Sequence, residues 1–280
     1  MISNLKNMLL ALANATGEPE ASSVAAYGLS LASQSGARLA VHSSSIRLAL
    51  PHSLVSDLAS GLVSTENARL KTLAETAAQD ALAAASLAGV ACTTQTPHLP
   101  YDQLVADLVA QARIHDLTVL DAAPSSVATD RGLIEAVLFD SGRPVLVVPA
   151  GIAEFRGRRI AVAWDGSARA ARALNDALPL LRAAEQVEIV SIQGEKDLSN
   201  AVPGVEVAPH LASHGITATV VDLTVEHNDV AQTLRTYALQ HRVDLIVMGA
   251  FVHSWLRQLI LGGVTRSLLK ASPVPLFLSY

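Results

Sequence analysis

Short apolar runs alternate with helical patterns along the chain. The runs predict buried β-strands at 7–14, 37–43, 159–165 and 186–192. Helical patterns lie at about 20–35, over an Ala-rich stretch at 52–88, at 205–213, and through Ala170, Leu174, Ala177, Leu178 and Leu181. Strands that alternate with helices form a parallel sheet covered on both faces. The pattern therefore predicts an α/β fold.

The two halves of the chain share one sequence pattern. A helical pattern runs into Asp-Leu-x-Val at 101–122 and again at 228–250, and the two aspartates, Asp116 and Asp244, are 128 positions apart. Each copy then ends in a proline and an apolar strand, at 143–149 and at 274–280. A repeat at about half the chain length predicts a duplicated domain. We expect the boundary near Phe155, which gives domains at 1–154 and 155–280.

Composition narrows the class of protein. Half of the residues are hydrophobic and 16% are charged, which suits a folded core, and the formal net charge is −5. That charge, without a basic stripe, argues against nucleic acid as the main partner. No apolar run is long enough to span a bilayer, no signal peptide is visible, and the single Cys92 excludes an internal disulfide. We expect a cytoplasmic protein that binds neither nucleic acid nor membrane.

The carboxyl ends of the strands are the expected ligand site, because such folds bind ligands where the strand order switches. In the second half this rule selects the residues after Ala163, Ile192 and Met248. Asp165 is the first candidate, since its carboxylate could accept hydrogen bonds from a ribose or a base. Asp-Gly-Ser is equally a good helix-capping turn, so both interpretations stay open.

The second candidate is the pair Gly262-Gly263, which opens a helical pattern. Backbone N–H groups at a helix start carry partial positive charge, and the absence of side chains lets a phosphate approach closely. Thr265 could add a hydroxyl and Arg266 a guanidinium. The same pair could instead be a plain loop closure before a helix.

Together these motifs resemble the universal stress protein family. Its members carry a strand ending in Asp-x-Ser and, later, Gly, two residues, Gly, nine residues, Gly, then Ser or Thr. Here the strand is IAVAWDGS, and the later pattern runs from Gly249 through Val252 to Gly262-Gly263 with the same spacing. Val252 replaces the second glycine and Gly263 the hydroxyl residue. These departures put a side chain near the phosphates and remove one donor.

The resemblance implies two tandem open parallel-sheet domains, Rossmann-like and similar to the adenine nucleotide alpha hydrolases. It also implies an adenine nucleotide, ATP, ADP or AMP, in the second domain. The residues that would bind it are Asp165, Ile192, Met248, Gly249, Val252, Gly262, Gly263, Val264 and Thr265. Magnesium could accompany the nucleotide, although the sequence shows no magnesium site, and no catalytic residue is assigned.

The first copy lacks the features that would bind a nucleotide. Asn14 or Ala15 stands at the position of Asp165, and Asp121 stands at that of Gly249. An acidic side chain at the phosphate mouth repels a nucleotide, so we expect none to bind here. Family members dimerise through the final strand. The resemblance therefore implies that 143–149 and 274–280 pair as an intrachain pseudo-dimer, and a homodimer could form by further self-association.

Three functions remain open at this point. The chain could be a stress-response sensor or regulator that binds a nucleotide, a slow ATPase with Asp165 as its placed base, or a nucleotide-free dimerisation and interaction module. Trp164 could stack on a base or pack in the core. His253 and Ser254, followed by Arg257, could be catalytic or phosphate-binding residues or could lie in a polar surface loop. The pair His210 and His214 beside Pro209 does not have the surroundings of a metal site, so no metal is expected.

Overall fold

The computed structural model describes residues 2–13, 23–49, 57–122, 129–193, 203–250, 252–255 and 258–280. The strands within these residues are β1 (Asn7–Ala13), β2 (Arg38–Ile46), β3 (Cys92–Gln95), β4 (His98–Leu99), β5 (Leu117–Asp121), β6 (Val145–Val148), β7 (Arg159–Ala163), β8 (Gln186–Gln193), β9 (Ala218–Thr224), β10 (Leu245–Gly249), β11 (Val252–Trp255), β12 (Gln258–Leu261) and β13 (Leu276–Ser279). The helices are α1 (Ser23–Ser35), α2 (Asp57–Leu87), α3 (Tyr101–Arg113), α4 (Thr129–Asp140), α5 (Ala168–Asp176), α6 (Leu178–Leu181), α7 (Gly204–Ser213), α8 (Val230–Gln240) and α9 (Gly263–Ala271).

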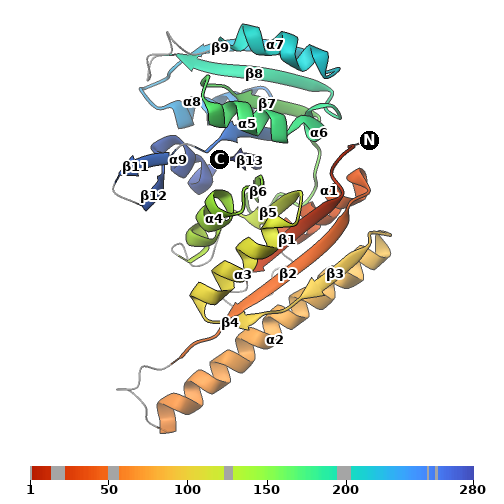
Figure 1. Cartoon of the computed structure of the whole chain (residues 1–280), viewed down its shortest axis with the longest axis vertical. Coiled ribbons are helices and arrows are strands. Elements are labelled where there is room, and N and C mark those ends of the chain that lie inside the picture. Colours follow the sequence, from red (N-terminus) through yellow and green to blue (C-terminus); the bar gives the residue numbers. More distant parts are fainter. Residues whose placement is uncertain are drawn as a thin grey trace.

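One large sheet runs through both halves of the molecule (Figure 1). Its strands lie in the order β3-β2-β1-β5-β6-β13-β10-β7-β8-β9, and β4 pairs with β2. Each half has the same order when it is followed from the outer end of the sheet to the middle: β3-β2-β1-β5-β6 in the first half and β9-β8-β7-β10-β13 in the second. All neighbours in the sheet are parallel except β6 and β13. The predicted α/β class is confirmed.

Two hydrophobic cores cover the two faces of this sheet. One core contains buried residues of α1, α5, α6 and α7, and the other contains buried residues of α3, α4, α8 and α9. Central strands such as β6, Val145–Val148, are buried at every position, as expected for a strand with helices on both faces. Each core spans both halves, so the halves share their packing. No helix in the described part of the chain is long and apolar enough to cross a membrane.

The repeated aspartates make the same contacts in the two halves. Asp116 accepts hydrogen bonds at one carboxylate oxygen from the N–H groups of Lys6 and Asn7, both at 2.9 Å. Asp244 accepts from the N–H groups of Arg158 (3.0 Å) and Arg159 (2.9 Å). In both halves the carboxylate thereby fixes the start of the first strand beside the strand that the aspartate precedes. This correspondence explains why the Asp-Leu-x-Val pattern recurs.

The strands β6 and β13 join the two halves edge to edge. They pair antiparallel, with Val147 opposite Leu276 and Val145 opposite Leu278. All four of these side chains are buried. The sequence predicts this pairing, and it satisfies backbone groups that each half alone would leave at a sheet edge.

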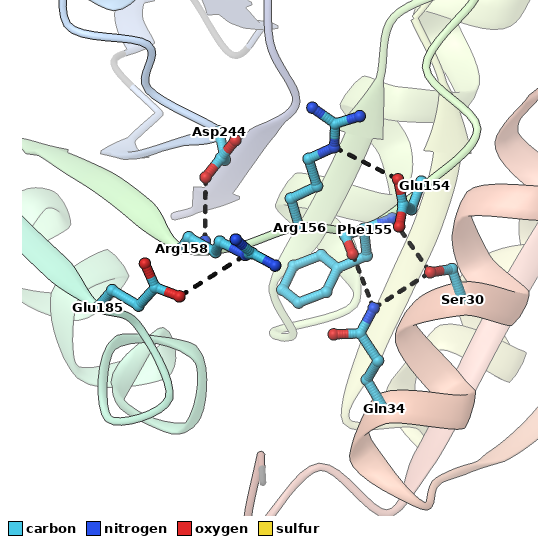
Figure 2. A network of polar contacts seen from close by, with 8 residues as sticks. All are labelled: Ser30, Gln34, Glu154, Phe155, Arg156, Arg158, Glu185 and Asp244. Atoms are coloured by element: carbon cyan, nitrogen blue, oxygen red, sulfur yellow. Dashed lines mark hydrogen bonds and ion pairs between the residues drawn. The ribbon is translucent and has the colours of Figure 1, made fainter.

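The segment between β6 and β7 is held against α1 (Figure 2). The Phe155 N–H donates to Ser30 Oγ (3.2 Å), and Gln34 Nε2 donates to the Phe155 carbonyl (2.7 Å). The Phe155 ring is buried and meets Tyr27 edge to face, with centroids 5.8 Å apart. Gly157 follows with φ +52°, where a Cβ would collide with that ring. This connection is therefore packed into the core of the first half.

Some elements differ from the expectation. The helical pattern through Ala170 and Leu181 is interrupted at Ala177, where α5 ends and α6 begins. Pro179 lies in the first turn of α6 and has no N–H to continue the bonding of α5, which explains the break. The strands β3, β4 and β9 were not predicted. β9 lies at the sheet end and has only exposed and partly buried positions, a weak signal for a strand.

We predict that Phe155→Ala lowers the free energy of unfolding by about 3 to 5 kcal/mol, because it removes a buried aromatic ring. Urea denaturation of the whole chain measures the change. Arg156→Ala is the matched control, since the neighbouring side chain is 67% exposed and its loss should cost less than about 0.5 kcal/mol. Similar losses in the two variants would contradict the packing role of Phe155.

Candidate functional site

The switch in strand order of the second half falls between β7 and β10. From β7 the chain proceeds outward to β8 and β9, and then returns to the other side of β7 as β10. Ala163 of β7 pairs with Met248 of β10, so the carboxyl ends of the two strands lie together. Ligands of open α/β sheets bind at such a point. The segments that follow these strands therefore form the candidate site.

Asp165 lies in a tight turn after β7. Its Oδ1 accepts a hydrogen bond from the Ser167 N–H (3.1 Å), and Gly166 between them has φ +69°. Ser167 then caps α5, because its Oγ accepts from the Ala170 N–H (3.1 Å). The capping turn that the sequence allowed is thus present. The same turn also fixes the carboxylate of Asp165 at the end of β7, which suits a ligand contact.

Gly249 ends β10 against the first turn of α5. A Cβ at this position would lie 2.5 Å from the carbonyl carbon of Arg169 and 2.6 Å from the nitrogen of Ala170. Real side chains do not come this close to backbone, so only glycine fits here. Close packing of α5 on β10 accounts for this glycine of the motif without a phosphate.

The start of α9 carries the glycine pair. Gly262 is the N-cap, and its carbonyl accepts the first helical hydrogen bond, from the Arg266 N–H (3.0 Å). Glycine offers no side chain to bond the N–H groups of the first turn, which have no partner within the helix. Gly263 is exposed, and no atom lies within 4 Å of where its Cβ would be. The helix start is therefore open at Gly263, which leaves room for an anion there, whereas Gly262 is buried.

A β-hairpin connects β10 to α9. Its strands β11 and β12 pair antiparallel, with Val252 opposite Leu261 and His253 opposite Ile260. Because Leu261 lies opposite Val252, the next residue, Gly262, is close to the start of the hairpin. The expectation of a surface loop at His253 and Ser254 is wrong, since both lie in β11. The hairpin was missed because its turn lacks the Gly, Asn or Asp signals that such turns usually carry. The side chain of Val252 lies outside the described residues.

The remaining predicted residues differ in how far their side chains are buried. Thr265 is fully buried, so its hydroxyl lies inside the protein. Met248 is also buried, while Ile192 and Val264 are partly buried against the same core. These four positions can contribute backbone groups to a ligand. Trp164 is buried in the core, which favours packing over stacking on a base.

Arg169 is a charged residue near the site that the sequence interpretation did not assign. Its backbone touches Gly249, and its guanidinium carbon lies 4.9 Å from the centre of the Tyr280 ring. The Tyr280 ring in turn meets Phe139 of α4 edge to face, with centroids 4.9 Å apart. The position of Arg169, four residues after Asp165, could have indicated that it lies near the site. Its stacking on Tyr280 could not be predicted, because the two residues are distant in sequence.

The corresponding point of the first half has different chemistry. Asp116 and Asp244 bond Asn7 and Arg159 in the same way, so these two strand residues correspond. Asp165 lies as far beyond Arg159 as Ala13 lies beyond Asn7. Ala13 therefore occupies the position of Asp165, whereas the sequence comparison placed Asn14 or Ala15 there without the strand register. Both of those residues lie outside the described part.

Of the two histidines at the end of α7, His214 contacts an arginine. The rings of His210 and His214 are 4.8 Å apart between centroids, and His214 Nδ1 is 3.1 Å from Arg182 Nη2. Within the residues that the structure describes, no three His, Cys, Asp or Glu side chains are grouped so that they could hold a metal.

Comparison with known proteins matches the second half to a family. Residues 157–279 match the model of the universal stress protein family. No curated protein matches the sequence significantly. A universal stress protein from Archaeoglobus fulgidus is similar in structure, at 19% identity and a TM-score of 0.68, over 99% of this chain and 98% of that one. A protein of unknown function from Pseudomonas aeruginosa is 13% identical, with a TM-score of 0.58, over 99% and 92% of the two chains.

These findings define the class of protein. The whole chain has the doubly wound α/β fold of those solved structures, with the strand order repeated in its two halves. Residues 157–279 form a domain of the universal stress protein family.

We predict that Gly249→Ala lowers the free energy of unfolding by about 1 to 3 kcal/mol, because the added methyl group forces α5 away from β10. Thermal or urea unfolding measures the loss. Gly263→Ala provides a control with the same change in the open start of α9, where stability should be unchanged or slightly higher. Equal stability of the two variants would contradict the close contact at Gly249.

Proposed function

We propose that the chain is a tandem universal stress protein with domains at 1–154 and 155–280. Its second domain binds one adenine nucleotide, ATP, ADP or AMP, and the chain acts in the cytoplasm as a sensor or regulator of the stress response. The proposal rests on family membership of residues 157–279 and on the chemistry of the switch point.

The main support for the proposal is that two chemically different groups follow neighbouring strands at the same edge of the sheet. A carboxylate held in a turn, Asp165, follows β7, and a helix start that is exposed at Gly263 follows the neighbouring β10 and its hairpin. A carboxylate suits the hydroxyl groups of a ribose or the amino group of a base. A helix start without a side-chain cap suits phosphate, which its N–H groups and dipole attract. A nucleotide carries both kinds of group.

The proposed roles follow from what each position presents. Asp165 accepts hydrogen bonds from the nucleoside, and the backbone at Ile192, Met248 and Gly249 lines its binding place. The N–H groups at Gly263 and Val264 contact phosphate. Thr265 contributes through its backbone, because its side chain is buried. In this proposal the backbone N–H of Gly263 replaces the hydroxyl donor that the family has at this position.

The first half is proposed to bind no nucleotide. Asp121 stands where the second half has Gly249, at the end of the corresponding strand, and Ala13 supplies no carboxylate in place of Asp165. A negative charge at the phosphate mouth opposes a polyphosphate. The chain should therefore hold a single nucleotide site.

We predict that Gly263→Asp weakens the binding of ATP or ADP at least roughly tenfold while the fold stays as stable as before. An aspartate at the first position of α9 stabilises the helix by roughly 0.3 to 1 kcal/mol, yet its charge repels phosphate. Isothermal titration measures the affinity, and thermal unfolding measures the stability.

Gly263→Asn is the matched control, because it has nearly the same size without the charge. Its affinity should stay within about threefold of the parent, since an uncharged side chain leaves the helix dipole in place. Unchanged binding in Gly263→Asp would sink the phosphate assignment. Equal losses in both variants would point to size and not charge, and would also contradict it.

A further inference from the structure

A group of three basic residues lies in the first half, at the carboxyl end of β2. It consists of Arg47 after β2, Lys71 on α2 and His98 on β4. Arg47 and Lys71 are exposed, and His98 is partly buried. The carboxyl end of β2 is at the same edge of the sheet as the ligand sites of this fold class. The chain as a whole is acidic, with a formal net charge of −5, so a local basic group at this edge needs an explanation.

Strand pairing places Arg47 two residues beyond the partner of His98. Ser45 of β2 pairs with His98 of β4, and Ser45 Oγ lies 2.8 Å from His98 Nδ1. The pairing continues one step further, where the Arg47 N–H donates to the Leu99 carbonyl (2.8 Å). One ring nitrogen of His98 is therefore held by a buried serine, and Nε2 is the nitrogen left to meet a ligand.

The register of α2 on β2 brings Lys71 to the same place. Ser43 Oγ donates to the Ala74 carbonyl (2.8 Å), which fixes α2 over the middle of β2. Asn67 accepts from the Leu48 N–H (2.8 Å) and donates to the Leu48 carbonyl (2.9 Å), which fixes the helix over the segment after β2. Lys71 is one helical turn from each of these contacts. It therefore lies level with the stretch from Ser45 to Arg47.

Arg47 and Lys71 act electrostatically on His98. Burial lowers the pKa of His98, the positive charges of Arg47 and Lys71 lower it further, and a hydrogen bond with Ser45 opposes the change. Positive charges that lower the pKa of a histidine also attract an anion to it.

Acidic side chains also lie on the packed elements. Lys71 lies 3.8 Å from Glu75 on the exposed face of α2, and Glu66 is paired with Arg69 at 2.6 Å. Asp102 lies in the first turn of α3, after β4. The pairs on α2 are all at least 39% exposed, where ion pairs are weak and readily exchanged for a stronger partner.

We propose that Arg47, Lys71 and His98 bind the phosphate group of a small molecule, at a second ligand site separate from the crevice of the second half. The guanidinium of Arg47 contacts two phosphate oxygens, the ammonium of Lys71 a third, and His98 donates from Nε2. The site gives the first half a ligand of its own at the sheet edge. It does not depend on nucleotide binding in the second half.

The test follows the ring signals of His98 by NMR in the whole chain while inorganic phosphate is added, and again with glycerol phosphate. The expected result is a saturable change in both titrations, with a rise in the pKa of His98. A bound phosphate stabilises the charged imidazole, and this is why its binding should raise the pKa of His98. Tighter binding of the ester supports the site and identifies an organic phosphate as its source, and tighter binding of inorganic phosphate supports it with the free ion as the source.

Arg47→Gln with Lys71→Gln should weaken the binding at least roughly tenfold, because two charge-assisted contacts are lost. Arg38→Gln is the matched control, since Arg38 is exposed at the opposite end of the same strand. It should leave the affinity within about twofold, because exposed charges that far away are largely screened. No change at His98, or an equal loss in the Arg38 variant, would overturn the proposal. Nucleotide binding in the second half can fail without altering either outcome, because His98 reports on the first half alone.

Discussion

The antiparallel pairing of β6 with β13 is the contact on which the rest of the structure depends. Each half by itself would end in a short, apolar strand with an open edge, which is a site for pairing with another chain. Joining Val145 and Val147 to Leu278 and Leu276 closes both edges at once. It also aligns the two halves, so that each hydrophobic core extends through both of them. Phe155 and its contacts with Ser30 and Gln34 then hold the connecting segment to α1 (Figure 2).

Helix α5 connects this junction with the candidate nucleotide site. It begins in the turn of Asp165 and passes directly against Gly249. Further along, Arg172 Nη2 donates to the Gly142 carbonyl of the first half (2.9 Å), and Asp176 accepts from Ser279 Oγ of β13 (2.9 Å). A ligand held by Asp165 would therefore contact the element that packs on both the junction and the first half.

Much of the fold could be predicted from the sequence, because strands buried on both faces appear as apolar runs and the two halves repeat their aspartates. The pairing of β6 with β13 was expected on other grounds, from the open edge of the final strand and from the resemblance to a family that dimerises through it. The hairpin β11–β12 was not, since its turn lacks the usual signals, and the break at Pro179 was hidden within a good helical pattern. At the candidate site, the sequence located Asp165 and the glycine pair. It could not reveal that Gly249 makes room for α5 or that Thr265 points inward, because both depend on packing between distant segments.

The central claim is that a duplicated fold keeps one nucleotide site, in its second half. Isothermal titration of the whole chain with ATP, ADP and AMP tests it most directly, because the number of molecules bound per chain distinguishes the halves. The account predicts one equivalent of at least one of these nucleotides, lost in Asp165→Ala. Two equivalents that both depend on Asp165, or binding unchanged in Asp165→Ala, would contradict this claim, and no binding would mean that the switch point of the second half serves packing alone.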